Sequence, residues 1–79
     1  MSNLPSPRHP VLPPDVYHAW QERMRAVREA TQMSQAHLES AKGEGFVLAL
    51  SRAQIIDNHD TQQMRTDLLH ALMENSERL

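Results

Sequence analysis

The chain has 79 residues, 39% of them hydrophobic and 23% charged, with a formal net charge of −2 and no cysteine. This length suits one small domain, and the absence of cysteine excludes a disulfide scaffold, a thiol nucleophile and a thiolate zinc site. With only three aromatic residues and two glycines, the composition argues against β-sandwiches and β-barrels.

The first 14 residues hold every proline of the chain, at positions 5, 7, 10, 13 and 14. Proline lacks a backbone N–H and fixes φ, so we expect residues 1–14 to form an extended or disordered arm. The spacing of Pro10 and Pro13 matches a polyproline ligand. The alternative is that Val11 and Leu12 anchor the arm on the domain or on a second subunit.

From residue 15 onward the composition is helical, with no proline and with glycine only at positions 43 and 45. Pro14 suits a first helical position, and Asp15 favours the first turn through the helix dipole. An apolar stripe at alternating spacings of four and three residues predicts one long helix over 15–42, although its middle is polar. The stripe consists of Trp20, Met24, Val27, Thr31, Ser34, Leu38 and Ala41.

Gly43 and Gly45 predict a turn that closes this first helix. A second helical segment is expected over 46–77. Its first five residues, from Phe46 to Leu50, are apolar on every side and alone could form a buried strand. The alanines in this region and the absence of any other credible strand to pair with it favour a buried helix. Asp60 and Gln63 have the spacing of a capping box, so a break at 57–60 with a last helix from Thr61 is the alternative to one continuous helix.

Candidate catalytic and metal-binding chemistry is sparse in this sequence. We find no phosphate-binding glycine loop, nucleophile elbow or zinc-protease motif. Asp57, His59 and Asp60 carry metal-ligand atoms, but two of the three lie on different helix faces, so we interpret them as a solvated turn or cap. A chain this small also lacks the walls of a substrate pocket. We therefore predict no enzymatic activity, no cofactor and no small-molecule substrate.

One segment, Arg25-Ala-Val-Arg28-Glu-Ala-Thr-Gln-Met33-Ser34-Gln35-Ala-His-Leu38, resembles the opening of a lambda-repressor-like (Cro/CI, XRE-type) helix-turn-helix domain. Gly43 falls where that family has a glycine, and residues 50–55 resemble the start of a recognition helix. The resemblance implies that Gln35 contacts phosphate. It further implies that Ser51, Arg52 and Gln54 face base edges. The chain departs from the family pattern at Glu39 and in the insertion from Glu44 to Ala49.

These observations predict an all-α fold: an antiparallel helical hairpin, or a three-helix domain, over residues 15–79. A two-helix hairpin cannot cover its own apolar stripes, so we expect a homodimeric four-helix arrangement or a groove for a partner. The stripes left uncovered would include Ile55, Leu68 and Leu72.

Two functions follow from this fold. The first is a small non-enzymatic interaction module (an adaptor, chaperone-like subunit or inhibitor) that binds another protein through an apolar helical face. The residues expected on that face are Trp20, Met24, Val27, Phe46, Leu50 and Ile56. The alternative is a DNA-binding regulator, which a helix break at 31–34 with Ser34 as N-cap would favour, whereas a continuous helix favours the hairpin.

No apolar run approaches the roughly 18 residues of a membrane span and no secretory signal opens the chain, so we expect a cytoplasmic protein without membrane contact.

Overall fold

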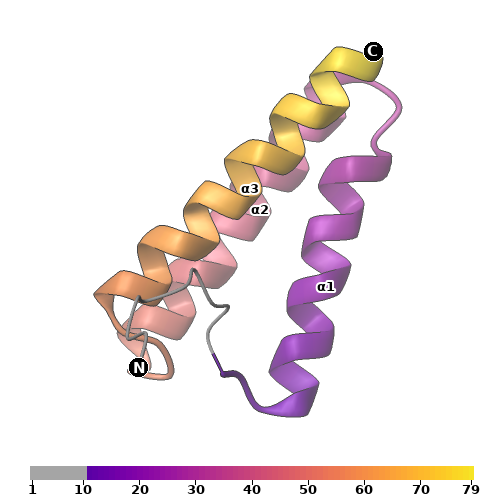
Figure 1. Cartoon of the computed structure of the whole chain (residues 1–79). Coiled ribbons are helices and arrows are strands. Elements are labelled where there is room, and N and C mark those ends of the chain that lie inside the picture. Colours follow the sequence, from indigo (N-terminus) through magenta and orange to yellow (C-terminus); the bar gives the residue numbers. More distant parts are fainter. Residues whose placement is uncertain (1–10) are drawn as a thin grey trace, which may run out of the picture.

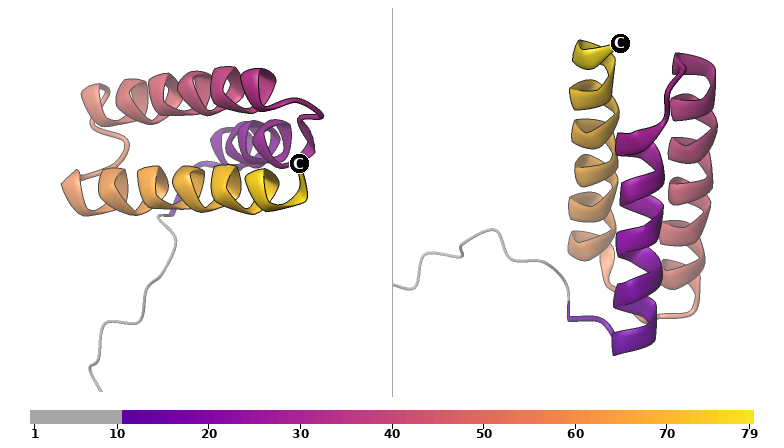
Figure 2. Two further views of the ribbon diagram at one scale, coloured as in Figure 1. Left: turned by 90° about the horizontal axis from the view of Figure 1, so that it is seen from above. Right: turned by 90° about the vertical axis from the view of Figure 1, so that its right-hand side faces the viewer.

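The computed structural model describes residues 11–79, which form three helices and no strand. The helices are α1 (Pro14–Glu29), α2 (Met33–Arg52) and α3 (Asn58–Arg78) (Figure 1). Helices α2 and α3 run antiparallel and side by side, and α1 packs over one side of this pair (Figure 2). The all-α prediction is confirmed in its three-helix form. Of the predicted arm, residues 1–10 lie outside the described part of the chain.

Helix α1 begins as the sequence predicts. Pro14 occupies its first turn, and the amide of Tyr17 donates to the carbonyl of Pro13 at 2.8 Å. Trp20, Met24 and Val27, spaced by four and three residues, form its buried face.

None of the helices in residues 11–79 combines the length and the apolar character that a membrane span requires.

The predicted continuous helix over 15–42 is wrong, because α1 ends at Glu29 and Ala30 is extended, with φ −59° and ψ 136°. A helix break does occur close to the predicted 31–34, at residues 30–32, but helix α2 starts at Met33 with Gln32 rather than Ser34 as its N-cap, so only the first half of the condition given for the helix-turn-helix interpretation is met. The end of α1 is stabilised from another helix: the buried Asn75 side chain of α3 donates to the carbonyls of Val27 and Ala30 at 2.7 and 3.0 Å. These bonds satisfy carbonyls that a helix end leaves without intrahelical partners.

The predicted turn at Gly43 and Gly45 is also wrong, because α2 passes through both residues and neither has a positive φ. Gly43 faces α3, and a Cβ atom there would lie 2.6 Å from Cδ2 of Leu68. A Cβ at Gly45 would meet nothing within 4 Å. Gly43 therefore permits close packing of two helices instead of ending one of them.

Helix α2 ends at Arg52, well after the expected turn, and Gln54 in the segment that follows has a φ of 60°, in the left-handed region. The amide of Ile55 donates to the carbonyl of Leu50, and that of Gln54 to the carbonyl of Ser51, both at 3.0 Å. This pair of bonds is a Schellman motif, a common helix ending, here with glutamine where glycine is usual.

The expectation of one continuous helix over 46–77 is thus wrong, and the break lies between Arg52 and Asn58 rather than at 57–60. Helix α3 opens with a capping box three residues earlier than predicted, formed by Asp57 and Asp60 instead of Asp60 and Gln63. The amide of Asp60 donates to Oδ1 of Asp57 at 2.7 Å, and the amide of Asp57 donates to Oδ2 of Asp60 at 3.4 Å. Asp60 is therefore the third helical residue and not the cap.

The core lies between the three helices and is closed within a single chain. Trp20 of α1 stacks on Phe46 of α2, with ring centroids 6.1 Å apart and an interplanar angle of 9°. The third helix buries apolar stripes that a two-helix hairpin would leave exposed. The buried core consists of Trp20, Met24, Val27, Val47, Leu50, Ile56, Met64, Leu68 and Ala71, with Leu12, Val16, Phe46 and Leu72 packed at its edge.

Candidate binding groove between helices α1 and α3

The six side chains expected on a partner-binding face belong to this core. Trp20, Met24, Val27, Leu50 and Ile56 are each at most 6% exposed, and Phe46 is half-buried. The expectation that they form an exposed helical face is therefore wrong. Some of them nevertheless reach a surface, because Trp20 and Met24 form the floor of a groove between α1 and α3.

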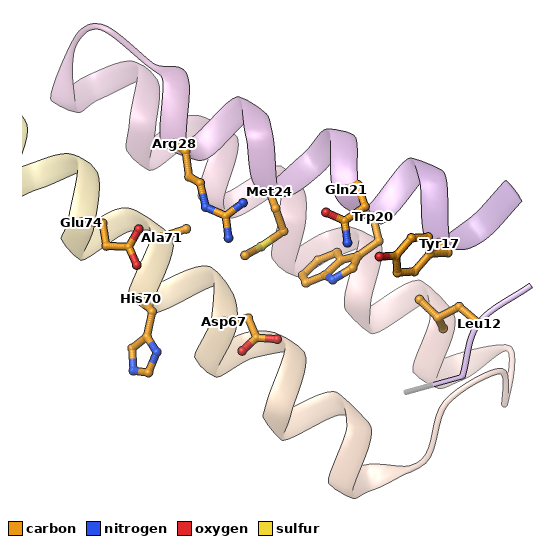
Figure 3. Close-up of a pocket in the computed structure, with 10 residues that line it drawn as sticks. All are labelled: Leu12, Tyr17, Trp20, Gln21, Met24, Arg28, Asp67, His70, Ala71 and Glu74. Atoms are coloured by element: carbon orange, nitrogen blue, oxygen red, sulfur yellow. The ribbon is translucent and has the colours of Figure 1, made fainter. Parts of the chain in front are cut away.

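This groove has a volume of about 400 Å³ and is open to solvent along the seam between the two helices (Figure 3). Its floor is apolar and consists of Trp20, Met24 and Ala71. Leu12, which precedes α1, lies at one end beside Tyr17 (Figure 3). The walls carry polar groups, from α1 Tyr17, Gln21 and Arg28 and from α3 Asp67, His70 and Glu74.

The groove follows from the way α1 is attached to α3. Near their C-terminal ends the two helices are joined by the Asn75 side chain and by the Arg78 guanidinium, which donates to the carbonyl of Arg28. Toward their N-terminal ends the helices diverge (Figure 1). Leu12 packs against the core at this open end, whereas Val11 is 95% exposed. Of the two anchors expected in the arm, Leu12 thus packs on its own domain and Val11 does not.

The walls of the groove differ in charge. The α3 wall carries two carboxylates, Asp67 and Glu74, while the α1 wall carries one cation, Arg28. The side-chain Nε2 of Gln63, one turn before Asp67, donates to Oδ1 of that carboxylate at 3.0 Å. An apolar floor between an acidic wall and a wall with one cation suits an amphipathic ligand with basic groups on the α3 side.

The four residues of the helix-turn-helix interpretation lie on one helix and the turn after it. Gln35 is in the first turn of α2, where its Oε1 accepts from the amide of Thr31 at 3.4 Å. Ser51 and Arg52 are in the last turn of α2, and Gln54 is in its C-terminal cap. A helix rises 1.5 Å per residue, so Gln35 and Arg52 are about 26 Å apart along one axis. The structure therefore does not bring these four residues together.

The acidic pair at the start of α3 has a structural role. The Asp60 backbone N–H that binds Asp57 lowers the pKa of the Asp57 carboxyl, because a donated hydrogen bond favours its charged form. Asp57 and Asp60 also border a second, shallow hollow over the α2–α3 turn, together with Gln54 and Ile55. Residues 11–79 contain no group of three side chains placed to hold a metal ion.

Sequence reasoning missed most of the groove. Tyr17, Gln21, Asp67 and Glu74 stand beside the apolar stripes, where a polar side chain is equally typical of a plain solvated surface. Asn75 left a clearer signal. It continues the stripe of Met64, Leu68 and Ala71 at the next spacing of four, so it occupies a core position that an apolar residue would ordinarily fill.

Comparison of the chain with protein-family models, with curated proteins and with solved structures gives no match.

Proposed function

We propose that this chain is a small non-enzymatic interaction module that acts in the cytoplasm as an adaptor, chaperone-like subunit or inhibitor. Its ligand is an amphipathic helix of another protein, held in the groove between α1 and α3. The observation that carries the proposal is the groove itself, with Trp20 and Met24 on its floor and the half-exposed Tyr17 on its wall.

The shape and the chemistry of the groove favour a helix as ligand. Two neighbouring helices of a bundle leave a channel that the apolar stripe of one further helix fills, which would complete a four-helix arrangement. Tryptophan and tyrosine are the residues that most often dominate binding energy, and methionine adapts its shape to a ligand. The floor is formed by side chains that the fold itself holds in place, so little ordering would oppose binding.

The charges of the walls orient the ligand. Glu74 on α3 attracts lysine or arginine on one flank of the bound helix, and Arg28 on α1 attracts a carboxylate on the other flank. Since the walls are exposed to solvent, these charges contribute more to the orientation and the rate of association than to affinity.

The proposal is tested with a displayed library of helical peptides, selected on the folded chain in the presence of nuclease. The expected result is enrichment of amphipathic peptides with an apolar stripe and basic residues on one flank. Calorimetry then measures the binding of a selected peptide to the variant Tyr17→Glu and to its control His18→Glu. The control introduces the same glutamate on the outer, exposed face of α1, away from the groove. We expect Tyr17→Glu to weaken binding by at least tenfold and His18→Glu to leave it unchanged.

A second pair of variants tests the charge of the α3 wall. Glu74→Arg is expected to weaken binding of a basic peptide, while Glu77→Arg, at an exposed position that does not border the groove, is expected to have a much smaller effect. Equal effects of all four variants, or no enrichment of amphipathic helices, would overturn the proposal. Specific, nuclease-sensitive capture of DNA by the folded chain would favour the DNA-binding regulator instead.

A further inference from the structure

The side of the α2–α3 pair that faces away from α1 exposes large apolar side chains. Leu38 and Leu48 on α2 are 55% and 43% exposed, and Leu69 and Met73 on α3 are 53% and 54% exposed. These are four of the eight large apolar side chains exposed in residues 11–79. The outer face of α1 is different, since its exposed side chains are His18, Glu22, Arg25 and Glu29.

One ion pair crosses the seam between α2 and α3 near these side chains. Glu44 of α2 and Arg65 of α3 meet at 3.1 Å, and their side chains are 47% and 48% exposed. Leu48 lies one turn after Glu44, and Leu69 lies one turn after Arg65. On α2 the exposed Ala41 and Gly45 complete the stripe, with spacings of three, four and three residues. We name this surface the α2/α3 patch: Leu38, Ala41, Gly45, Leu48, Leu69 and Met73, with Glu44 and Arg65 among them.

We propose that the α2/α3 patch binds the same patch of a second copy of this chain. The two-fold axis runs parallel to the helices, so α2 of each copy lies over α3 of the other. Glu44 of each copy then faces Arg65 of the other, which gives two intermolecular attractions. A two-fold axis perpendicular to the helices would instead place Glu44 against Glu44 and Arg65 against Arg65. The charges therefore select one of the two face-to-face arrangements.

The sizes of the side chains fit the same arrangement. The Gly43–Leu68 approach and the Glu44–Arg65 pair fix the antiparallel register of α2 and α3, and this register puts Ala41 level with Leu69. Under the proposed symmetry, Leu69 of one copy packs over Ala41 of the other, a large side chain on a small one. Gly45 has open space around its missing side chain, which lets the second copy approach the α2 backbone closely.

This dimer leaves the groove between α1 and α3 accessible, because the patch and the groove share no residue. Two copies would thus present two grooves, and a partner with two helical segments, or a partner that is itself a dimer, would be bound more tightly than through one groove. The dimer does not depend on the proposed function, and either proposal can fail without the other.

The test is sedimentation of the full chain over a range of concentrations, with variants that exploit the ion pair. The wild-type chain is expected to sediment at twice its monomer mass when concentrated. Arg65→Glu makes the patch doubly acidic and Glu44→Arg makes it doubly basic, so each variant alone is expected to be monomeric. An equimolar mixture of the two is expected to form a heterodimer, because each acidic patch then faces a basic one.

Folding of each variant is verified by circular dichroism, and the exposed position of the pair means that its loss affects folding little. Leu69→Lys tests the apolar part of the patch and is expected to abolish the dimer, whereas Val11→Lys, outside the patch, is expected to retain it. A monomeric wild-type chain would overturn the proposal. So would a dimer that survives Arg65→Glu and Leu69→Lys, or single variants whose mixture stays monomeric.

Discussion

Helix α3 contacts its two neighbours in different ways. Toward α2 it packs closely, because Gly43 leaves room for the Leu68 side chain and the Glu44–Arg65 pair crosses the seam nearby. Toward α1 it donates hydrogen bonds from Asn75 and Arg78 near the C-terminal ends of the two helices. Closer to their N-terminal ends, α1 and α3 enclose a groove. The seam between α2 and α3 is thus closely packed, whereas the seam between α1 and α3 is joined at one end and opens into a groove.

This difference shows how a chain of 79 residues can combine a buried core with an open groove. Glycine at position 43 allows the close contact of α2 with α3, since a Cβ there would lie 2.6 Å from Cδ2 of Leu68 and would force that side chain to shift. Asn75 fixes α1 by binding its terminal carbonyls, which holds one end and leaves the rest of the seam free for larger side chains. Trp20 and Met24 occupy that seam and form the groove floor.

Replacing Asn75 would break the closed end of the α1–α3 seam and is expected to have the largest effect on stability. Asn75→Ala removes both bonds to α1 and leaves the carbonyls of Val27 and Ala30 without that donor. We expect a loss of roughly 2–4 kcal/mol in the free energy of unfolding. Chemical denaturation measures this, and Asn58→Ala at an exposed position is the control, expected to cost far less.

Hydrogen exchange of the same variant localises the effect. Amides at the C-terminal end of α1 are expected to lose protection before those of α2 and α3, because only the attachment of α1 has been weakened. Uniform loss of protection across the three helices would show that Asn75 does not act on α1 in particular.

Gly43→Ala probes the closed seam between α2 and α3. The new methyl group would lie 2.6 Å from Cδ2 and 3.1 Å from Cδ1 of Leu68, which is only 1% exposed and cannot move aside freely. Overpacking of a core costs about 1–3 kcal/mol, and the better helix propensity of alanine recovers about 1 kcal/mol of it. We expect a net loss of about 1 kcal/mol by urea denaturation. A stabilised variant would contradict the packing role of Gly43.

Gly45→Ala is the matched control for that substitution and a prediction in its own right. The position is helical, exposed and free of neighbours within 4 Å, so the alanine gains helix propensity without overlap. We expect stabilisation of about 0.5–1 kcal/mol, measured at a low concentration where the chain is monomeric. Opposite signs at two glycines of one helix would show that the face toward α3 decides the outcome.

Gln54→Gly concerns the turn that joins α2 to α3. The left-handed conformation of Gln54, with φ 60°, is strained for a residue with a side chain. Glycine relieves the strain but is more flexible in the unfolded chain, so we expect a small gain of about 0.5 kcal/mol. Gln54→Ala is the control, expected to give no gain by thermal unfolding.

Acid is expected to have the smallest effect, through the capping box of α3. The pKa of Asp57 is lower in the folded chain than its ordinary value of 3.8, chiefly because of the hydrogen bond from the Asp60 amide. Its stabilising contribution is therefore complete above the ordinary value and is lost as the pH falls through the lowered pKa. In Asp57→Asn this part of the acid dependence should disappear, as measured by unfolding at a series of pH values.

Much of the fold could be predicted because it depends on periodicity. The stripes of Trp20, Met24 and Val27 and of Met64, Leu68 and Ala71 identify buried helix faces, and the structure buries all six residues. Helix boundaries depend on other causes. The residue types at positions 43 and 54 suggest the wrong roles. Gly43 suggests a turn but lies inside a helix, where it contacts α3 closely. Gln54 suggests a helix interior but occupies the left-handed position after a helix end, where glycine is usual.

The groove could be predicted only in part. The prediction of a partner groove in a small helical domain stays a prediction, and Trp20 and Met24 do border a groove. Its walls follow from the relative placement of α1 and α3, which depends on Asn75, forty-five residues from the carbonyl of Ala30 that it binds. Local patterns carry no information on such a contact.

The most direct test of the binding role is a map of backbone chemical-shift changes on the labelled chain, with a peptide selected from the helical library. Binding in the groove predicts that the largest changes fall at Tyr17, Gln21 and Arg28 on α1 and at Asp67, His70 and Glu74 on α3, with Leu38, Leu48 and Arg52 unaffected. Changes centred on α2, or spread evenly over the three helices, would contradict a binding site between α1 and α3.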